Sequence, residues 1–209
     1  MLADTQFAGR GRHGRSWSSP PGAGLYVSIL LRPGAVVPPL LTLAAGVALA
    51  EGMQAASGLN PQLKWPNDVL FGGRKLAGIL AESCLQPEGV APAIVLGIGI
   101  NVRASLHTLS VKEIATSLEE ELDRKVDRGL LLAECLVALA TRYADLQGGR
   151  ATDVLTAWRA RADLGRPVEW KVGGRLCHGV AETVDETGAL AVRTDGGLVL
   201  LTSSEVRWT

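Results

Sequence analysis

The feature that most constrains the fold is a change in hydrophobic periodicity near residue 163. Before it, apolar runs of strand length alternate with long helical stretches rich in Ala and Leu. After it, apolar and polar residues alternate between Gly-containing turns, which is typical of short antiparallel strands. The 209 residues are therefore predicted to form two units, 1–162 and 163–209.

The first unit is predicted to be an α+β domain, a mixed β-sheet flanked by helices. The uninterrupted apolar run 93–100 predicts a central strand, and Gly72-Gly73 marks a hairpin. Other strands are expected over 2–6, 25–31, 62–65, 69–71 and 75–83, and a turn over 87–92. Helices are expected over 39–57, 112–122, 127–146 and 152–161, with Asp127 and Thr152 as N-caps.

The second unit predicts about five short strands, closed into a small barrel of the SH3 type. Its turn signals lie at Gly173-Gly174, 186–188 and 195–197. A module of this size is marginal alone, so we expect it to pack on the first unit.

Composition excludes several classes of protein. Twenty-one basic residues balance twenty-one acidic ones, so no overall field attracts nucleic acid or an anionic membrane. No uninterrupted apolar run approaches the roughly 20 residues that span a bilayer, and the N-terminus lacks a signal-peptide pattern. The three cysteines are far apart and odd in number, which favours a reducing cytoplasm over a disulfide framework. The three histidines are also scattered, so no metal-ligand cluster is indicated.

The segment Gly9–Trp17 carries the strongest local signal. It matches G-x-G-x-x-G, but it opens a polar loop rather than a helix, so the dinucleotide-binding interpretation fails. Three arginines on a flexible, glycine-rich backbone suit a carboxylate or phosphate ligand. A solvated basic loop or a weak RNA-binding element explains this segment about equally well.

Three further segments place polar residues at strand ends. Lys64-Trp65-Pro66-Asn67-Asp68 turns through an X-Pro step, which is also an ordinary turn sequence. The run 75–80 puts Lys75 at a strand start and Gly78 inside the strand, where a ligand or backbone approaches closely. The run 97–101 ends in Asn101, which binds a ligand or only ends the strand.

Taken together and in this order, these motifs resemble the biotin protein ligase family. The resemblance covers Gln6–Arg12, Gly14–Trp17, Lys64–Asp68, Lys75–Leu80, 97–101 and the start of the second unit at 164–168. It implies a catalytic domain like that of the class II synthetases, followed by a small SH3-like barrel.

The resemblance also implies a two-step reaction. Biotin and Mg-ATP give biotinyl-5'-AMP and pyrophosphate, and a lysine on the biotin carboxyl carrier subunit of a carboxylase then takes the biotin. It assigns catalysis to Lys75, Arg10 and Arg12, with Lys75 between the biotin carboxyl and the α-phosphate. Biotin is placed on Gln6, Arg10, Gly11, Arg12, Lys75 and Gly78. ATP is placed on Arg12, Trp17, Lys64, Asn67 and Asn101, and Mg²⁺ on Asp68.

The chain departs from the family pattern near its start. It has no counterpart of the DNA-binding helix-turn-helix of repressor-type members, so no DNA binding is expected. A Ser-Thr-Asn element that contacts biotin is absent before residue 6, so we expect a weakened biotin pocket and an exposed sheet edge that favours a homodimer. The alternatives are a lipoate-type carboxylate–AMP ligase, a truncated biotin-binding protein with little turnover, and a nucleic-acid-binding protein. The last is disfavoured by zero net charge and the lack of an aromatic stacking series.

Overall fold

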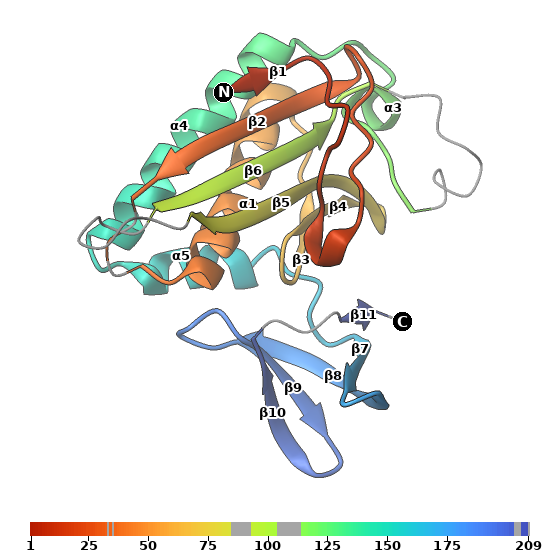
Figure 1. Ribbon diagram of the computed structural model, residues 1–209, viewed down its shortest axis with the longest axis vertical. Helices are drawn as coiled ribbons and strands as arrows, with labels where there is room; N and C mark the ends of the chain where they lie inside the picture. Colours follow the sequence, from red (N-terminus) through yellow and green to blue (C-terminus); the bar gives the residue numbers. More distant parts are fainter. Residues whose placement is uncertain (33, 35, 85–92, 104–113, 203–205, 209) are drawn as a thin grey trace.

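The protein is described here by a computed structural model that covers residues 1–32, 34, 36–84, 93–103, 114–202 and 206–208. Two sheets form its framework (Figure 1). The larger has the order β1-β2-β6-β5-β4-β3, with neighbouring strands antiparallel. Its strands are β1 (Leu2–Ala3), β2 (Gly24–Leu31), β3 (Gln62–Lys64), β4 (Asp68–Phe71), β5 (Arg74–Cys84) and β6 (Ala93–Asn101). The central position of β6 confirms the prediction drawn from its apolar run.

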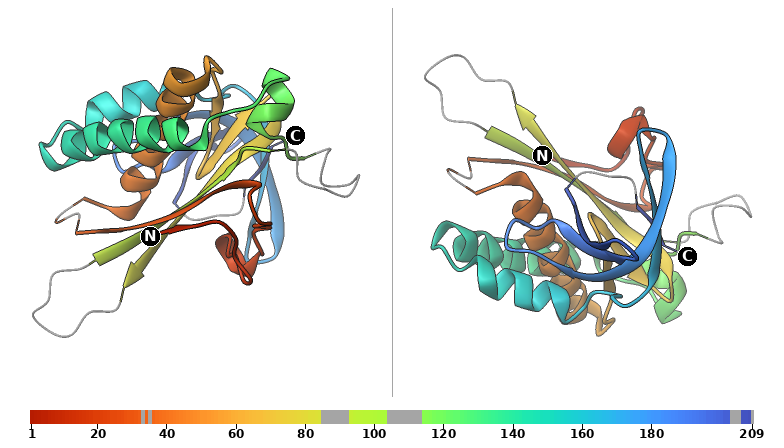
Figure 2. Two further views of the ribbon diagram at one scale, coloured as in Figure 1. Left: turned by 90° about the horizontal axis from the view of Figure 1, so that it is seen from above. Right: turned by 90° about the horizontal axis from the view of Figure 1, so that it is seen from below.

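One face of this sheet is covered by helices. Helix α1 (Pro38–Ser57) packs on the sheet, and α4 (Arg128–Gln147) and α5 (Ala151–Arg159) pack on α1, while the short α3 (Leu118–Leu122) lies near the end of β6. Figure 2 shows α1 lying against the sheet with α4 outside it, while the N-terminal segment projects from the opposite face. The end of this helix expected at residue 57 is confirmed, because Gly58 follows α1 with φ +82°.

Helix α1 forms the centre of the core. Among the described residues it is the one helix long and apolar enough to cross a membrane, and it is longer than the uninterrupted apolar run in the sequence. However, 67% of that apolar window is buried inside the protein, against the sheet on one side and α4 and α5 on the other. Its composition therefore reflects burial on both sides.

Two predictions about helix boundaries are wrong. Of the helix expected over 112–122, only Leu118–Leu122 is helical; residues 114–117 run beside β5, and 112–113 lie outside the described residues. Thr152 is not an N-cap, because α5 begins at Ala151 with Arg150 in the capping position. Asp127 does cap α4, since its Oδ1 accepts hydrogen bonds from the amides of Gly129 and Leu130. The turn expected over 87–92 also lies outside the described residues.

The C-terminal unit has the five strands expected. They are β7 (Pro167–Val172), β8 (Arg175–Val184), β9 (Leu190–Thr194), β10 (Gly197–Leu201) and β11 (Arg207–Trp208). Their order is β10-β9-β8-β7-β11. The expected closed barrel is not found: within the described residues, no ladder joins β10 to β11. The boundary expected after residue 162 stays a prediction.

The C-terminal unit packs on the first, as expected. The buried Trp65 indole donates its Nε1–H to the carbonyl of Gly188 at 3.0 Å, across the two units. Gly188 has φ +84°, and a Cβ atom added there would lie 3.3 Å from both Pro39 and Leu43 at the start of α1. Residues of both units belong to a single apolar cluster.

We expect Trp65→Phe to lower the free energy of unfolding by about 1 kcal/mol more than Trp170→Phe does. Both indoles are buried, at 2% and 3% exposure, but within the described residues only that of Trp65 has a partner for its N–H. Urea unfolding followed by circular dichroism measures the difference. Equal losses in the two variants would show that the hydrogen bond across the units contributes nothing to the free energy of unfolding.

Candidate active site

A cavity of about 840 Å³ is lined by β2, β5, β6 and the N-terminal segment, which projects from the sheet face opposite α1 in Figure 2. Strands β2, β5 and β6 supply its floor, and the segment 6–17 and the turn before β4 supply its walls. The C-terminal unit adds Glu169, Trp170, Lys171, Leu176, Val206 and Arg207. Of the eleven residues nominated from the sequence, ten line this cavity, and Asn101 does not.

The Gly-Arg segment forms a hairpin that is closed by backbone hydrogen bonds. The amide of Trp17 donates to the carbonyl of Gly9 at 2.8 Å, and that of Gly11 to Arg15 at 2.7 Å. His13 and Gly14 make the reversal with positive φ, at 55° and 72°. At its base, the hydroxyl of Ser19 donates to Oε1 of Gln6 at 2.6 Å. The hairpin therefore holds its basic side chains over the sheet.

Two glycines on neighbouring strands make room for the indole of Trp17. A Cβ atom added at Gly78 would lie 2.9 Å from the ring, and one at Gly99 would lie 2.6 Å from it. Gly78 and Gly99 face each other in the β5–β6 register. The close approach expected at Gly78 is therefore made by Trp17 of the same chain.

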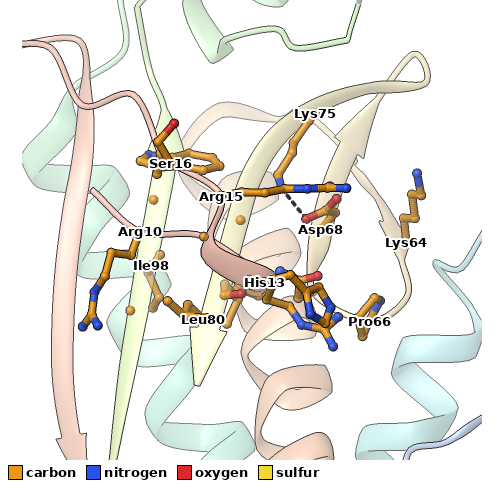
Figure 3. A pocket seen from close by; sticks show the side chains of 18 of the residues that line it. Arg10, His13, Arg15, Ser16, Lys64, Pro66, Asp68, Lys75, Leu80 and Ile98 are labelled. Atoms are coloured by element: carbon orange, nitrogen blue, oxygen red, sulfur yellow. Dashed lines mark hydrogen bonds and ion pairs between the residues drawn. The ribbon is translucent and has the colours of Figure 1, made fainter. Parts of the chain in front are cut away.

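Lys75 and Asp68 form the central charged pair. The Nζ of Lys75 lies 2.5 Å from Oδ1 of Asp68 and 5.2 Å from the centroid of Trp17 (Figure 3). Both side chains are partly withdrawn from water, at 30% and 22% exposure. The carboxylate and the ring thus stabilise the ammonium group at a fixed position above the glycine floor.

Two further cations surround Asp68. Burial lowers the pKa of Arg12, and the nearby Asp68 opposes that effect. Burial also lowers the pKa of Lys64; Asp68 raises it, while Lys75, Arg166 and Arg15 lower it. Cations that are desolvated and crowded in this way favour an anionic ligand, because it offsets both costs.

Arg10 lies apart from this group. Figure 3 shows its side chain pointing away from Lys75 and Asp68. It pairs with Glu82 on β5 at 2.9 Å, with the two side chains 72% and 40% exposed. Such an exposed pair contributes little to stability, so the guanidinium can exchange Glu82 for another anion at the cavity rim.

The two nominated asparagines donate to backbone carbonyls. The Nδ2 of Asn67 lies 2.8 Å from the carbonyl of Ile79, and Asn67 still borders the cavity. The Nδ2 of Asn101 donates to the carbonyls of Lys75 and Thr116, at 3.3 and 3.0 Å. These bonds connect the ends of the strands that carry the site.

Sequence reasoning missed several residues of the cavity. Arg15 extends over it toward Asp68 in Figure 3, and its signal was present in the same Gly-Arg run. Glu82 lies four residues beyond Gly78 on β5 and gave no signal of its own. Lys171 and Arg207 belong to the other unit, so spacing along the chain could not connect them with the site.

Comparison with known proteins assigns both units to known families. The Biotin/lipoate A/B protein ligase family matches residues 1–101, and the Biotin protein ligase C terminal domain matches residues 163–207. A biotin--[acetyl-CoA-carboxylase] ligase of Paracoccus denitrificans is 38% identical over 99% of this chain and 88% of its own length. The chain belongs to the biotin protein ligase family.

Other members of this family extend the comparison. A biotin--[acetyl-CoA-carboxylase] ligase of Mycobacterium tuberculosis is 35% identical over 99% of this chain and 77% of its own length. The bifunctional ligase/repressor BirA of Bacillus subtilis is 34% identical, and this chain spans 65% of its length. The biotin protein ligase of Aquifex aeolicus in complex with biotin and ATP superposes with a TM-score of 0.86 at 28% identity, covering 100% of this chain and 88% of that one.

We expect Gly99→Ala to lower the free energy of unfolding by about 1–3 kcal/mol, because its methyl group would overlap the Trp17 ring. Gly97→Ala on the same strand is the control, since its methyl group would meet only the carbonyl and Cβ of Leu80, at 3.5 and 3.8 Å. Trp17→Ala in the Gly99→Ala background should recover the loss. Thermal unfolding measures all three variants, and equal stability of the two alanine variants would refute the packing of Trp17 on the floor.

Proposed function

We propose that this member of the biotin protein ligase family activates biotin with ATP and transfers it to a carrier protein. One observation carries the proposal: Lys75, Arg12 and Lys64 converge around Asp68 in one partly desolvated cavity. Its proposed ligands are a carboxylate and a triphosphate, which repel each other and need fixed positive charge between them.

In the first step, a carboxylate oxygen of biotin attacks the α-phosphorus of ATP. The new O–P bond forms as the bond to the β-phosphate oxygen breaks, so biotinyl-5'-AMP and pyrophosphate result. Charge develops on the α-phosphate oxygens, and Lys75 Nζ is held in the cavity by Asp68 and the Trp17 ring. Held there before the reaction, it stabilises the transition state without reorganisation.

In the second step, the amine of the carrier lysine attacks the carbonyl carbon of the adenylate. An amide bond forms, AMP leaves with the electron pair of the C–O bond, and the amine loses a proton. Biotinyl-5'-AMP must persist until the carrier arrives. The hairpin 9–17 lies over the site and keeps water from the mixed anhydride.

We also assign Mg²⁺ to Asp68, directly or through water. The described residues hold no cluster of three or more His, Cys, Asp or Glu side chains that would form a closed metal cage. One carboxylate beside a phosphate site fits Mg²⁺, which keeps several waters and takes substrate phosphates as ligands. When bound, the ion would neutralise phosphate charge, while Arg12 and Lys64 hold the remaining anionic oxygens.

Pyrophosphate release from Mg-ATP in the presence of biotin tests the proposal. A rate equal to that of a blank without biotin would refute it. Lipoate, tested in parallel by turnover and by thermal shift, decides whether the chain is the related lipoate-type ligase. Stabilisation by biotin without turnover would instead identify a biotin-binding protein of low activity.

We expect Lys75→Ala to lower the rate of adenylate formation by about 10²–10³-fold. The free energy of unfolding should fall by at most about 1 kcal/mol, because Lys75 begins a strand and its ion pair is partly exposed. Lys125→Ala, at an exposed position between α3 and α4, is the control. Stopped-flow pyrophosphate detection and thermal unfolding give the two readouts. Near-normal turnover of Lys75→Ala would show that Lys75 is a surface lysine without a catalytic role.

The proposed partners are the biotin carboxyl carrier subunit of a carboxylase and a second copy of this chain. β1 covers only part of β2, and such an open sheet edge favours pairing. We propose no DNA or membrane partner, given the balanced charge and the burial of α1. Salt-dependent binding to DNA would contradict this. The three unpaired cysteines support a cytoplasmic location.

A further inference from the structure

Residues 114–117 run beside the start of β5, in the position that β6 leaves after Asn101. The amide of Lys75 donates to the carbonyl of Ile114 at 2.8 Å, and the amide of Thr116 donates to the carbonyl of Lys75 at 2.9 Å. Both backbone polar groups of Lys75 are thus bound by this short segment. The side-chain amide of Asn101 adds bonds to the carbonyls of Lys75 and Thr116.

A second set of contacts fixes this segment from behind. Thr116 is 1% exposed, and its hydroxyl donates to Oε1 of Glu121 at 2.5 Å. The same oxygen accepts a bond at 2.6 Å from Nη2 of Arg74, the residue before Lys75. The contacts therefore form a closed ring, which starts at Arg74 and returns to Lys75 through Glu121 and Thr116.

The ring is separate from the cavity. Arg74, Thr116, Glu121 and Asn101 do not line it, whereas Ile114, at the start of the segment, does. Any effect of the ring on the reaction must therefore pass through Lys75 or Ile114. A displacement of about 1 Å in a reacting group can cost 10²-fold in rate, so the backbone that carries Lys75 must be held firmly.

We infer that Arg74, Thr116 and Glu121 are positioning residues that hold the Lys75 ammonium at the reacting phosphate. The inference rests on the proposed function, in which Lys75 stabilises the α-phosphate. Glu120 differs in a useful way: its Oε1 also accepts a bond from Arg74 at 2.6 Å, but no bond joins it to Thr116 among the contacts of the described residues.

The central experiment compares Thr116→Val with Thr116→Ser. Valine keeps the shape of threonine but removes the hydroxyl, while Glu121 keeps its ion pair with Arg74, so no buried carboxylate is left alone. We expect kcat for adenylate formation to fall about tenfold in Thr116→Val, with KM for biotin and ATP within about twofold of the wild type. Thr116→Ser, which keeps the hydroxyl, should restore kcat.

A matched pair on α3 separates position from charge. Glu121→Ala should lower kcat about tenfold, whereas Glu120→Ala, which removes an equal charge from the same arginine, should leave it within about twofold. Similar losses in both variants would mean that only the charge on Arg74 matters, and would overturn the inference.

A double-mutant cycle tests whether the effect passes through Lys75. In the Lys75→Ala background, Thr116→Val should produce no further loss of rate, because the group being positioned is gone. The same tenfold loss in both backgrounds would show a structural role alone and would overturn the inference. Unchanged kcat in Thr116→Val within the wild-type chain would do so as well.

Hydrogen exchange gives a readout that needs no turnover. We expect exchange of the Lys75 and Thr116 amides to speed up at least tenfold in Thr116→Val and to stay near wild type in Thr116→Ser. If the wild-type chain releases no pyrophosphate, the proposed function fails, and the exchange rates still decide on the ring. Equal exchange in the two variants would overturn the inference.

Discussion

The burial of α1 is the constraint on which the remaining structure depends. This helix covers one face of the six-stranded sheet and is itself covered by α4 and α5, so the apolar core lies on that side. The opposite face is therefore available for a ligand. The hairpin lies over this second face, and residues of the C-terminal unit border the same cavity.

The chemistry of the site follows from the partial burial of its charged side chains. Asp68 is the carboxylate at the centre, and three cations, Arg12, Lys64 and Lys75, lie around it. Burying these charges is costly without opposite charge nearby. In the proposed reaction, an anionic substrate adds negative charge at this site. Binding energy is thereby available for bringing two like-charged substrates together, which is the difficult part of carboxylate activation.

The backbone around Lys75 is also held in place. Its amide and carbonyl are bound by residues 114–117, and the Arg74–Glu121–Thr116 ring fixes that segment. The lysine side chain is long and flexible, so a fixed backbone and a fixed counter-ion together restrict where the ammonium group lies. The Trp17 ring, which packs on Gly78 and Gly99, further limits where the ammonium group lies.

The sequence by itself determined the elements whose signals are local: the apolar strand β6, the stop of α1 at Gly58, the cap at Asp127 and the ordered motifs that resemble the family. It failed where contacts between distant residues decide the outcome. Residues 114–117 leave the expected helix because Lys75 offers backbone partners. The tertiary structure alone brought Lys171 and Arg207 to the cavity, because the packing of two units, and no spacing along the chain, sets which surfaces meet.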